Sequence, residues 1–265
     1  MLFRNLVPFR VYSLTRKSPY PSVMKKLLIY GFAIIICFTA GCKKDKQNKI
    51  YLLQQQIVDY TSVGGSFDTL TYTYDSKNRI TTIKENTLPV TSFNITYDNV
   101  NRVITASKYN GNTLLIEFNF FYSANKSGYY FHGPNRATDT AYFTFNSKNQ
   151  LTKIQANYSG SQVFTYDNND NVETSESFGA DGTNELGNKV SYSYDNQKNP
   201  FSDMPANNYF FMYVAYNDAS TLKHNVVVRD ADSYLYTYNT DGFPVSAQAS
   251  TTTTTISILY NYIIK

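Results

Sequence analysis

The chain has 265 residues, of which 17% are charged and 16% are aromatic, and its formal net charge is +4. This length is enough to bury a sizeable core. Several of the positive charges lie within residues 1–49. The rest is near neutral or slightly acidic and lacks the basic stripe expected of a nucleic-acid-binding protein. With two histidines and two cysteines, we expect no metal site, disulfide framework or cofactor.

The first predicted segment is an export leader. Residues 1–23 are basic and contain three prolines, and we interpret them as an upstream mis-start before Met24. Residues 25–38 comprise two lysines and an apolar run of about 12 residues, which is too short to span a bilayer as a helix. Residues 39–42 read Thr-Ala-Gly-Cys, similar to a lipobox. The pattern predicts a lipoprotein signal peptide over residues 24–41 rather than an ordinary secretory signal or a retained anchor.

Cleavage before Cys42 would make this cysteine the new N-terminus, and lipid attached to it would hold the protein at a membrane. Residues 42–51 then form a charged tether, either a solvated spacer or part of a surface-export signal. We expect a lipoprotein of the cell envelope, on the periplasmic or surface-exposed face of the outer membrane. Cys37 leaves with the signal peptide, so the mature chain has no disulfide partner for Cys42.

Residues 52–265 are predicted to form one β domain, because they repeat a short pattern about every 23 residues. Each copy places apolar residues two apart and ends in Tyr-Asp or a close equivalent, which is typical of a strand with one buried face. The structural repeat markers are Tyr74, Asp75, Tyr97, Asp98, Tyr122, Phe145, Tyr166, Asp167, Tyr194, Asp195, Tyr216, Tyr238 and Tyr260.

The residues after each marker predict a tight turn. Asp75 and Asp98 can accept hydrogen bonds from backbone amides two residues further on. Asn78 and Asn101 follow where the turn needs a positive φ, and Gly242 takes that place in the last complete copy. Turn signals therefore recur about every ten residues, as in an all-β chain.

The segments 74–80 and 97–103 resemble the YD repeats of the Rhs family, whose units read Tyr-Asp, two variable residues, Gly-Arg and an apolar residue. Here Asn-Arg replaces Gly-Arg, and later copies lose the arginine. In size and layout the chain resembles small Bacteroidota lipoproteins of unknown function with degenerate YD-like hairpins. That resemblance implies a porin-like β-sheet over roughly residues 52–265.

We predict an antiparallel meander of about eight repeated hairpins. These would give about sixteen strands, with a further strand over residues 52–60 and a closing strand over 256–264. A sheet this wide with one apolar face must curl into a barrel-like or flattened tube. We expect that face to point inward. The competing arrangement turns it outward into lipid, as in an outer-membrane barrel.

Candidate catalytic and metal-binding residues are few. His132 is predicted in a loop and His224 lies far from it in sequence, so neither supports a metal site. The Asp167–Asn171 turn is rich in oxygen ligands but lacks the Gly and Glu of an EF-hand, which favours a plain hairpin turn. Asp181–Glu185 is a second, weaker calcium candidate, and Asp230 and Asp232 are predicted at a turn.

The leading functional prediction is a non-enzymatic, lipid-anchored envelope protein that serves as a binding or structural module. Its ligand would be a glycan or another envelope protein, bound by irregular loops over residues 123–140 and 179–189. One alternative is an integral outer-membrane barrel with a pore-like role. Another is a glycan-active enzyme, which would need two carboxylates converging from different strands.

Overall fold

The structure of the protein is a computed structural model. It describes residues 48–60, 64–86, 90–124, 126–134, 136–158, 160–182, 184–204 and 223–265. The predicted mis-start, the signal peptide, Cys42 and Tyr216 all lie outside these ranges. Residues 49–265 form one compact unit, and the fold described below belongs to it.

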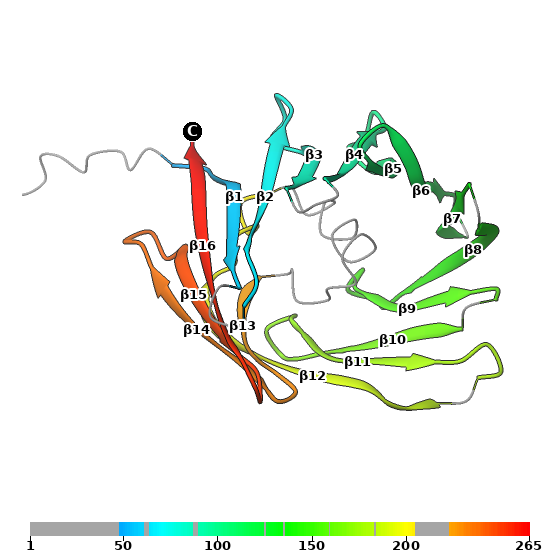
Figure 1. Cartoon of the computed structure of the whole chain (residues 1–265). Helices are drawn as coiled ribbons and strands as arrows, with labels where there is room; N and C mark the ends of the chain where they lie inside the picture. The colour runs from blue at the N-terminus through cyan, green and yellow to red at the C-terminus, as the bar shows by residue number, and fades with distance from the viewer. Residues whose placement is uncertain are drawn as a thin grey trace, which may run out of the picture. The chain divides into compact units, whose positions relative to one another are not determined.

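The described part of this unit is a closed antiparallel barrel in which the strands follow one another in chain order (Figure 1). The strands are β1 (Tyr51–Asp59), β2 (Phe67–Tyr74), β3 (Ile80–Glu85), β4 (Thr91–Tyr97), β5 (Val103–Asn110), β6 (Thr113–Tyr122), β7 (Ser127–Gly133), β8 (Arg136–Phe145), β9 (Leu151–Ala156), β10 (Ser161–Tyr166), β11 (Val172–Phe178), β12 (Asn184–Lys198), β13 (His224–Arg229), β14 (Asp232–Tyr238), β15 (Pro244–Ser250) and β16 (Thr255–Ile264). The predicted all-β meander is confirmed. Among the described residues, no helix is long and apolar enough to cross a membrane.

The barrel closes where the last strand pairs with the first. β16 runs antiparallel to β1, with Tyr51 opposite Ile264 and Asp59 opposite Ser257. The two predicted outermost strands are thus neighbours, and the sheet has no free edge. The described chain contributes sixteen strands, where about sixteen and two terminal ones are predicted. The predicted strand that ends at Tyr216 lies outside the described residues, and β12 pairs directly with β13.

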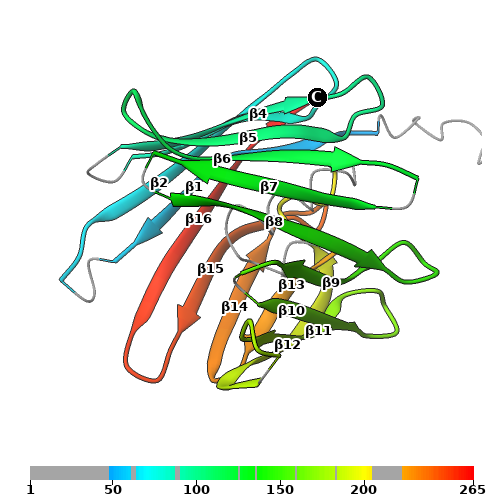
Figure 2. The same cartoon turned by 90° about the vertical axis from the view of Figure 1, so that its right-hand side faces the viewer.

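The two faces of the wall differ in polarity, as the alternation predicts. In β4, Phe93 and Ile95 are buried, while Asn94 and Thr96, which each follow one of them, are exposed. The strands curl around a common interior (Figure 2), and the buried residues form two clusters. The prediction that the apolar face points inward is confirmed. Tertiary burial of aromatic and branched side chains therefore drives closure.

The connection after β12 contributes to the larger cluster. Phe201 and Met204 are both buried in it, and the Phe201 ring meets the Tyr72 ring of β2 edge-on at 5.5 Å between centroids. The Asp203 carboxylate accepts a 2.8 Å hydrogen bond from the backbone amide of Tyr51. A sixteen-stranded wall is too wide for its own side chains to fill, so the chain supplies part of its own core from this connection.

The outer face of the wall is largely polar. One row of paired residues crosses six strands and comprises Thr73, Thr82, Asn94, Ser107, Glu117 and His132. A second row comprises Thr144, Lys153, Val163, Glu176 and Lys189. Large exposed apolar side chains are interspersed with polar ones: Leu235 lies opposite Gln248, and Leu259 lies between Ser246 and Ile57. Apolar residues scattered in this way are normal on a surface in contact with water.

Two predicted loops are corrected by the structure. Residues 123–140 contain β7 and the beginning of β8, so His132 lies in a strand opposite Glu117. Three consecutive aromatic residues at 129–131 obscure the alternation in the sequence, although Tyr129 packs inward and Tyr130 is exposed. In residues 179–189 only a short turn precedes β12, which begins at Asn184. Asp232 likewise begins β14, whereas Asp230 is in the turn.

Candidate functional site

Each complete turn is organised by the aspartate or asparagine that begins it. In the turn between β2 and β3, Asp75 Oδ1 accepts hydrogen bonds from the amides of Lys77 and Arg79 at 2.9 and 3.0 Å. The Arg79 guanidinium pairs with the other carboxylate oxygen at 2.6 Å. Asn78 has φ = 62°, and a β-bulge follows in the return strand. Asp98 and Arg102 repeat this arrangement, which confirms the predicted turn chemistry.

Neighbouring turns are joined to each other along this end of the barrel, called the turn rim below. Asn101 Oδ1 accepts hydrogen bonds from Lys77 and Arg79 of the preceding turn, at 3.1 and 3.0 Å. Lys148 and Gln150 likewise donate hydrogen bonds to Asp170 Oδ1 of the next turn, at 3.0 and 3.1 Å. The Arg79 guanidinium also lies over the Tyr97 ring, 4.3 Å from its centroid. Long polar side chains, Arg79 in one case and Lys148 with Gln150 in another, therefore link neighbouring turns.

The marker tyrosines join successive hairpins through their hydroxyl groups. In five hairpins the hydroxyl donates to the backbone carbonyl of the residue that starts the previous return strand, at 2.6–2.9 Å. The pairs that follow this rule are Tyr97 with Ile80, Tyr122 with Val103, Tyr166 with Leu151, Tyr194 with Val172 and Tyr262 with Pro244. Tyr74 donates to Leu53. Burial raises the pKa of Tyr122 and of Tyr166 to about 12, so these hydroxyls remain protonated donors.

Two markers depart from the predicted pattern. Asp195 does not begin a turn, because β12 continues to Lys198. Its carboxylate accepts a hydrogen bond from the amide of Gln197, two residues further on, and also from Asn225 and Tyr238. Tyr260 lies inside β16, and Tyr262 two residues later makes the marker contact. The last repeat pairs with β1 and has no return strand, so no turn follows Tyr260, and the predicted closing strand over residues 256–264 is confirmed.

The turn aspartates predict an acid-sensitive rim. Partial burial alone would raise the pKa of the Asp98 carboxyl, but the amide and guanidinium of Arg102 outweigh it and lower the pKa. In the unfolded chain an aspartate has a pKa of about 3.9, and in the folded protein the pKa of Asp98 is lower. The stability that Asp98 contributes is therefore complete at a pH above the unfolded pKa, and it is lost as the pH falls through the folded pKa. We therefore expect the melting temperature to fall as the pH is lowered from about 5 to about 3. The melting temperature of the Asp98→Asn variant should fall less over the same range. Parallel melting curves for the two proteins would contradict this prediction.

The remaining predicted chemical residues do not assemble a metal site. His132 Nε2 lies 3.9 Å from Glu117, and His224 Nδ1 lies 3.0 Å from Asn171 Oδ1. Asp167 is used by its own turn, because Asn171 donates to it from both backbone and side chain. In the described part of the chain, no group of three His, Cys, Asp or Glu residues is arranged to hold a metal ion. The plain hairpin-turn interpretation of Asp167–Asn171 agrees with this geometry.

One pair of carboxyl groups converges from neighbouring strands. Asp68 of β2 lies near Glu85 of β3, at the end of the barrel opposite the turn rim. Burial, and after it the charge of Glu85, raises the pKa of Asp68. Glu85 also accepts a 2.6 Å hydrogen bond from the Thr91 hydroxyl. Asp68 lies opposite Val58 of β1, and Glu85 lies opposite Leu70 of β2. Both carboxyl side chains are therefore on the inner face.

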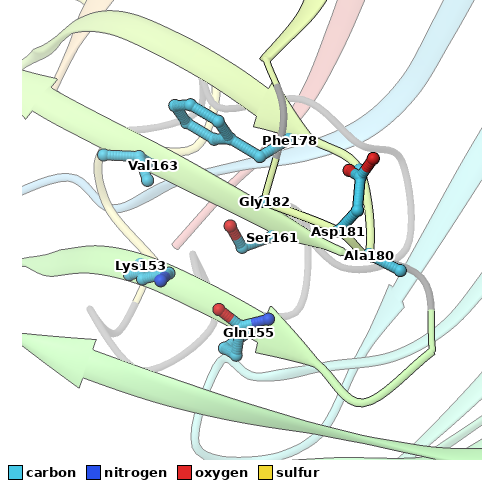
Figure 3. Close-up of a pocket in the computed structure, with 9 residues that line it drawn as sticks. Lys153, Gln155, Ser161, Val163, Phe178, Ala180, Asp181 and Gly182 are labelled. Atoms are coloured by element: carbon cyan, nitrogen blue, oxygen red, sulfur yellow. The ribbon is translucent and has the colours of Figure 1, made fainter.

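The outer face carries a shallow groove of about 460 Å³ at the end of the barrel opposite the turn rim (Figure 3). We call this the β9–β11 groove. Its lining comprises Lys153, Gln155, Ser161, Val163, Phe178 and the turn at residues 179–182. Ser161 pairs with Gln155 on one side and with Phe178 on the other, so the three side chains share one face. The sequence predicted a binding loop near here, but the strand residues of the groove were missed because alternation alone gives no sign of them.

Tight backbone packing shapes this groove. Gly160 has φ = 88°, and a Cβ at that position would lie 2.0 Å from the carbonyl oxygen of Phe178. Gln155 Nε2 donates to the carbonyl oxygens of Ala156 and Gly160, at 3.1 and 3.2 Å. The amide side chain is therefore held in place, with its oxygen available as an acceptor. Tyr142 of β8 lies opposite Gln155 on the same outer face, and its ring contacts the Phe121 ring edge-on at 6.0 Å between centroids.

Comparison with known proteins gives distant similarities. No protein-family model matches this chain, and no curated protein matches it. A solved structure of a porin-like protein from Bacteroides uniformis is 14% identical, covers 81% of this chain and 96% of its own, and has a TM-score of 0.48. A solved structure of TcdB2–TccC3 without its hypervariable C-terminal region is 10% identical over 71% of this chain and 9% of its own, with a TM-score of 0.20.

Proposed function

We propose that this protein is a non-enzymatic, lipid-anchored barrel of the cell envelope that binds a ligand on its outer surface. The observation that carries the proposal is the polarity of the wall. Glu117, Lys153 and Glu176 lie on its outer face within strands, whereas aromatic residues such as Phe93 fill its inside. A lysine facing lipid at the middle of a bilayer costs about 2–4 kcal/mol, so this wall suits water better than lipid.

The lipid anchor is inferred from the sequence around Cys42. The chain enters the barrel at the turn rim, where Ile50 and Lys265 exchange backbone hydrogen bonds and Lys49 pairs with Asp241. Lys49 comes seven residues after Cys42, a span of at most about 25 Å when fully extended. A lipid on Cys42 would therefore keep the turn rim near the membrane, and the opposite end, with the β9–β11 groove, would face away from it.

Two measurements on cells test this proposal. We expect the full-length protein to incorporate an alkyne-labelled fatty acid and to fractionate with membranes, and Cys42→Ala to incorporate no label. Replacing residues 1–42 with a signal peptide that is cleaved completely should release the barrel as a soluble periplasmic protein. If the barrel without Cys42 stayed in carbonate-washed membranes, the wall would have to face lipid and the proposal would be overturned.

A further inference from the structure

We propose that the β9–β11 groove binds an extended, uncharged oligosaccharide, which deepens the proposed binding function and rests on it. The groove combines an aromatic side chain, a planar amide and a hydroxyl on one face of the sheet, contributed by Phe178, Gln155 and Ser161. A sugar ring offers an apolar face of C–H groups and a rim of hydroxyl groups. Aromatic rings and planar amides complement those two features.

The Phe178 side chain is the aromatic platform of this site. It ends β11, opposite Ser161, and lies on the outer face because its neighbours Ser175 and Ser177 take the inner positions beside Phe164 and Gln162. Figure 3 shows the Phe178 ring at one side of the groove, with Ser161 between it and Gln155. The volume of about 460 Å³ lies in the range of small-molecule sites.

The polar groups of the groove are held in position before a ligand binds. Gln155 uses its amide nitrogen on two backbone carbonyls, so its oxygen can accept a hydrogen bond from a sugar hydroxyl without loss of side-chain freedom. Fixed donors and acceptors lower the entropy cost of binding. The close approach of Gly160 to Phe178 fixes the two strands that carry the platform and the serine.

The charge of the groove selects among ligand classes. Lys153 and Asp181 are the charged residues that line it, one of each sign, so its net charge is zero. A phosphate or nucleic-acid ligand would require an excess of positive charge. A neutral sugar chain needs hydrogen-bond donors and acceptors rather than net charge, and the Ser161 hydroxyl and the Gln155 oxygen supply both kinds.

The cross-strand row on the outer face that contains Phe178, Ser161 and Gln155 continues beyond the groove to Tyr142 of β8. Tyr142 pairs with Gln155, so it lies three strand spacings, about 14 Å, from Phe178. Its ring is positioned by Phe121 at 6.0 Å and by the Lys126 ammonium at 5.4 Å from its centroid. A single sugar ring cannot contact both aromatic residues, whereas an extended oligosaccharide can. The ligand is therefore a chain of sugars lying across β8–β11.

The test is an array of neutral and acidic oligosaccharides probed with the full-length protein in detergent, followed by calorimetry with the strongest ligand. We expect neutral oligosaccharides to bind. Phe178→Ala should weaken binding at least about tenfold, and Phe178→Tyr should retain it because the aromatic face is kept. Tyr142→Ala should weaken binding of long oligosaccharides and leave short ones unchanged. Gln155→Ala, at an exposed position, should also weaken binding and provides a second variant if Phe178→Ala does not fold.

The matched control is Phe67→Ala, which removes another aromatic side chain from the outer face, 60% exposed and on β2. It should bind as the unmodified protein does. Three results would overturn the proposal: no oligosaccharide bound by the folded protein, binding only of acidic oligosaccharides, or unchanged binding by Phe178→Ala or Gln155→Ala. Fatty-acid labelling and fractionation do not depend on sugars, so failure of the ligand assignment is distinguishable from failure of the anchored-barrel proposal.

Discussion

Replacing Phe243 with alanine is expected to destabilise the barrel by about 3–5 kcal/mol, the largest single effect predicted for this chain. Phe243 is fully buried just before β15, at the repeat position that Arg79 and Arg102 occupy in earlier turns. Its ring stacks on Tyr51 of β1 at 4.5 Å between centroids and meets Tyr262 of β16 at 5.6 Å. It therefore fills the seam at which the barrel closes.

The free energy of unfolding, measured by urea titration of the purified protein, checks this prediction. Leu235→Ala is the matched control, because it deletes a side chain that is 71% exposed on the outer face of β14. Its effect should stay within about 0.5 kcal/mol. Similar losses for Phe243→Ala and Leu235→Ala would mean that the seam is not packed as described.

Replacing Gly160 with alanine should cost about 2–5 kcal/mol of unfolding free energy. The residue has φ = 88°, which an L side chain adopts at a cost of about 1–2 kcal/mol. The new Cβ would also lie 2.0 Å from the carbonyl oxygen of Phe178, so β10 and β11 must separate locally. Overpacking of this kind adds about 1–3 kcal/mol.

A second glycine separates the two contributions. Gly111, in the turn between β5 and β6, also has a positive φ of 55°, but nothing lies within 4 Å of a Cβ built there. Gly111→Ala should therefore cost about 1–2 kcal/mol, the backbone contribution alone. Equal thermal shifts for Gly160→Ala and Gly111→Ala would show that the backbone contact at Gly160 contributes nothing to stability.

Local chemistry made the turns and strands predictable from the sequence. Asp75, Asn78 and Arg79 interact mainly within their own turn, so their spacing alone predicts the hydrogen bonds and the positive φ that the structure contains. Alternation in β4 likewise predicts which side chains are buried, because a strand has two faces. The candidate groove was not predictable in this way. Its residues are set by the cross-strand register of β9, β10 and β11, which no local pattern encodes.

The sequence by itself determined the all-β class, the repeat and the turn chemistry, since each depends on residues close together in the chain. Alternation left open whether the apolar face points inward or into lipid, and the packed clusters decided this. The tertiary structure alone decided the number of strands, the pairing of β16 with β1 and the packing of Phe201 against Tyr72. It also showed that Tyr262, rather than Tyr260, makes the last marker contact. These features join residues far apart in the chain, and their energies depend on register and packing that appear only when the barrel closes.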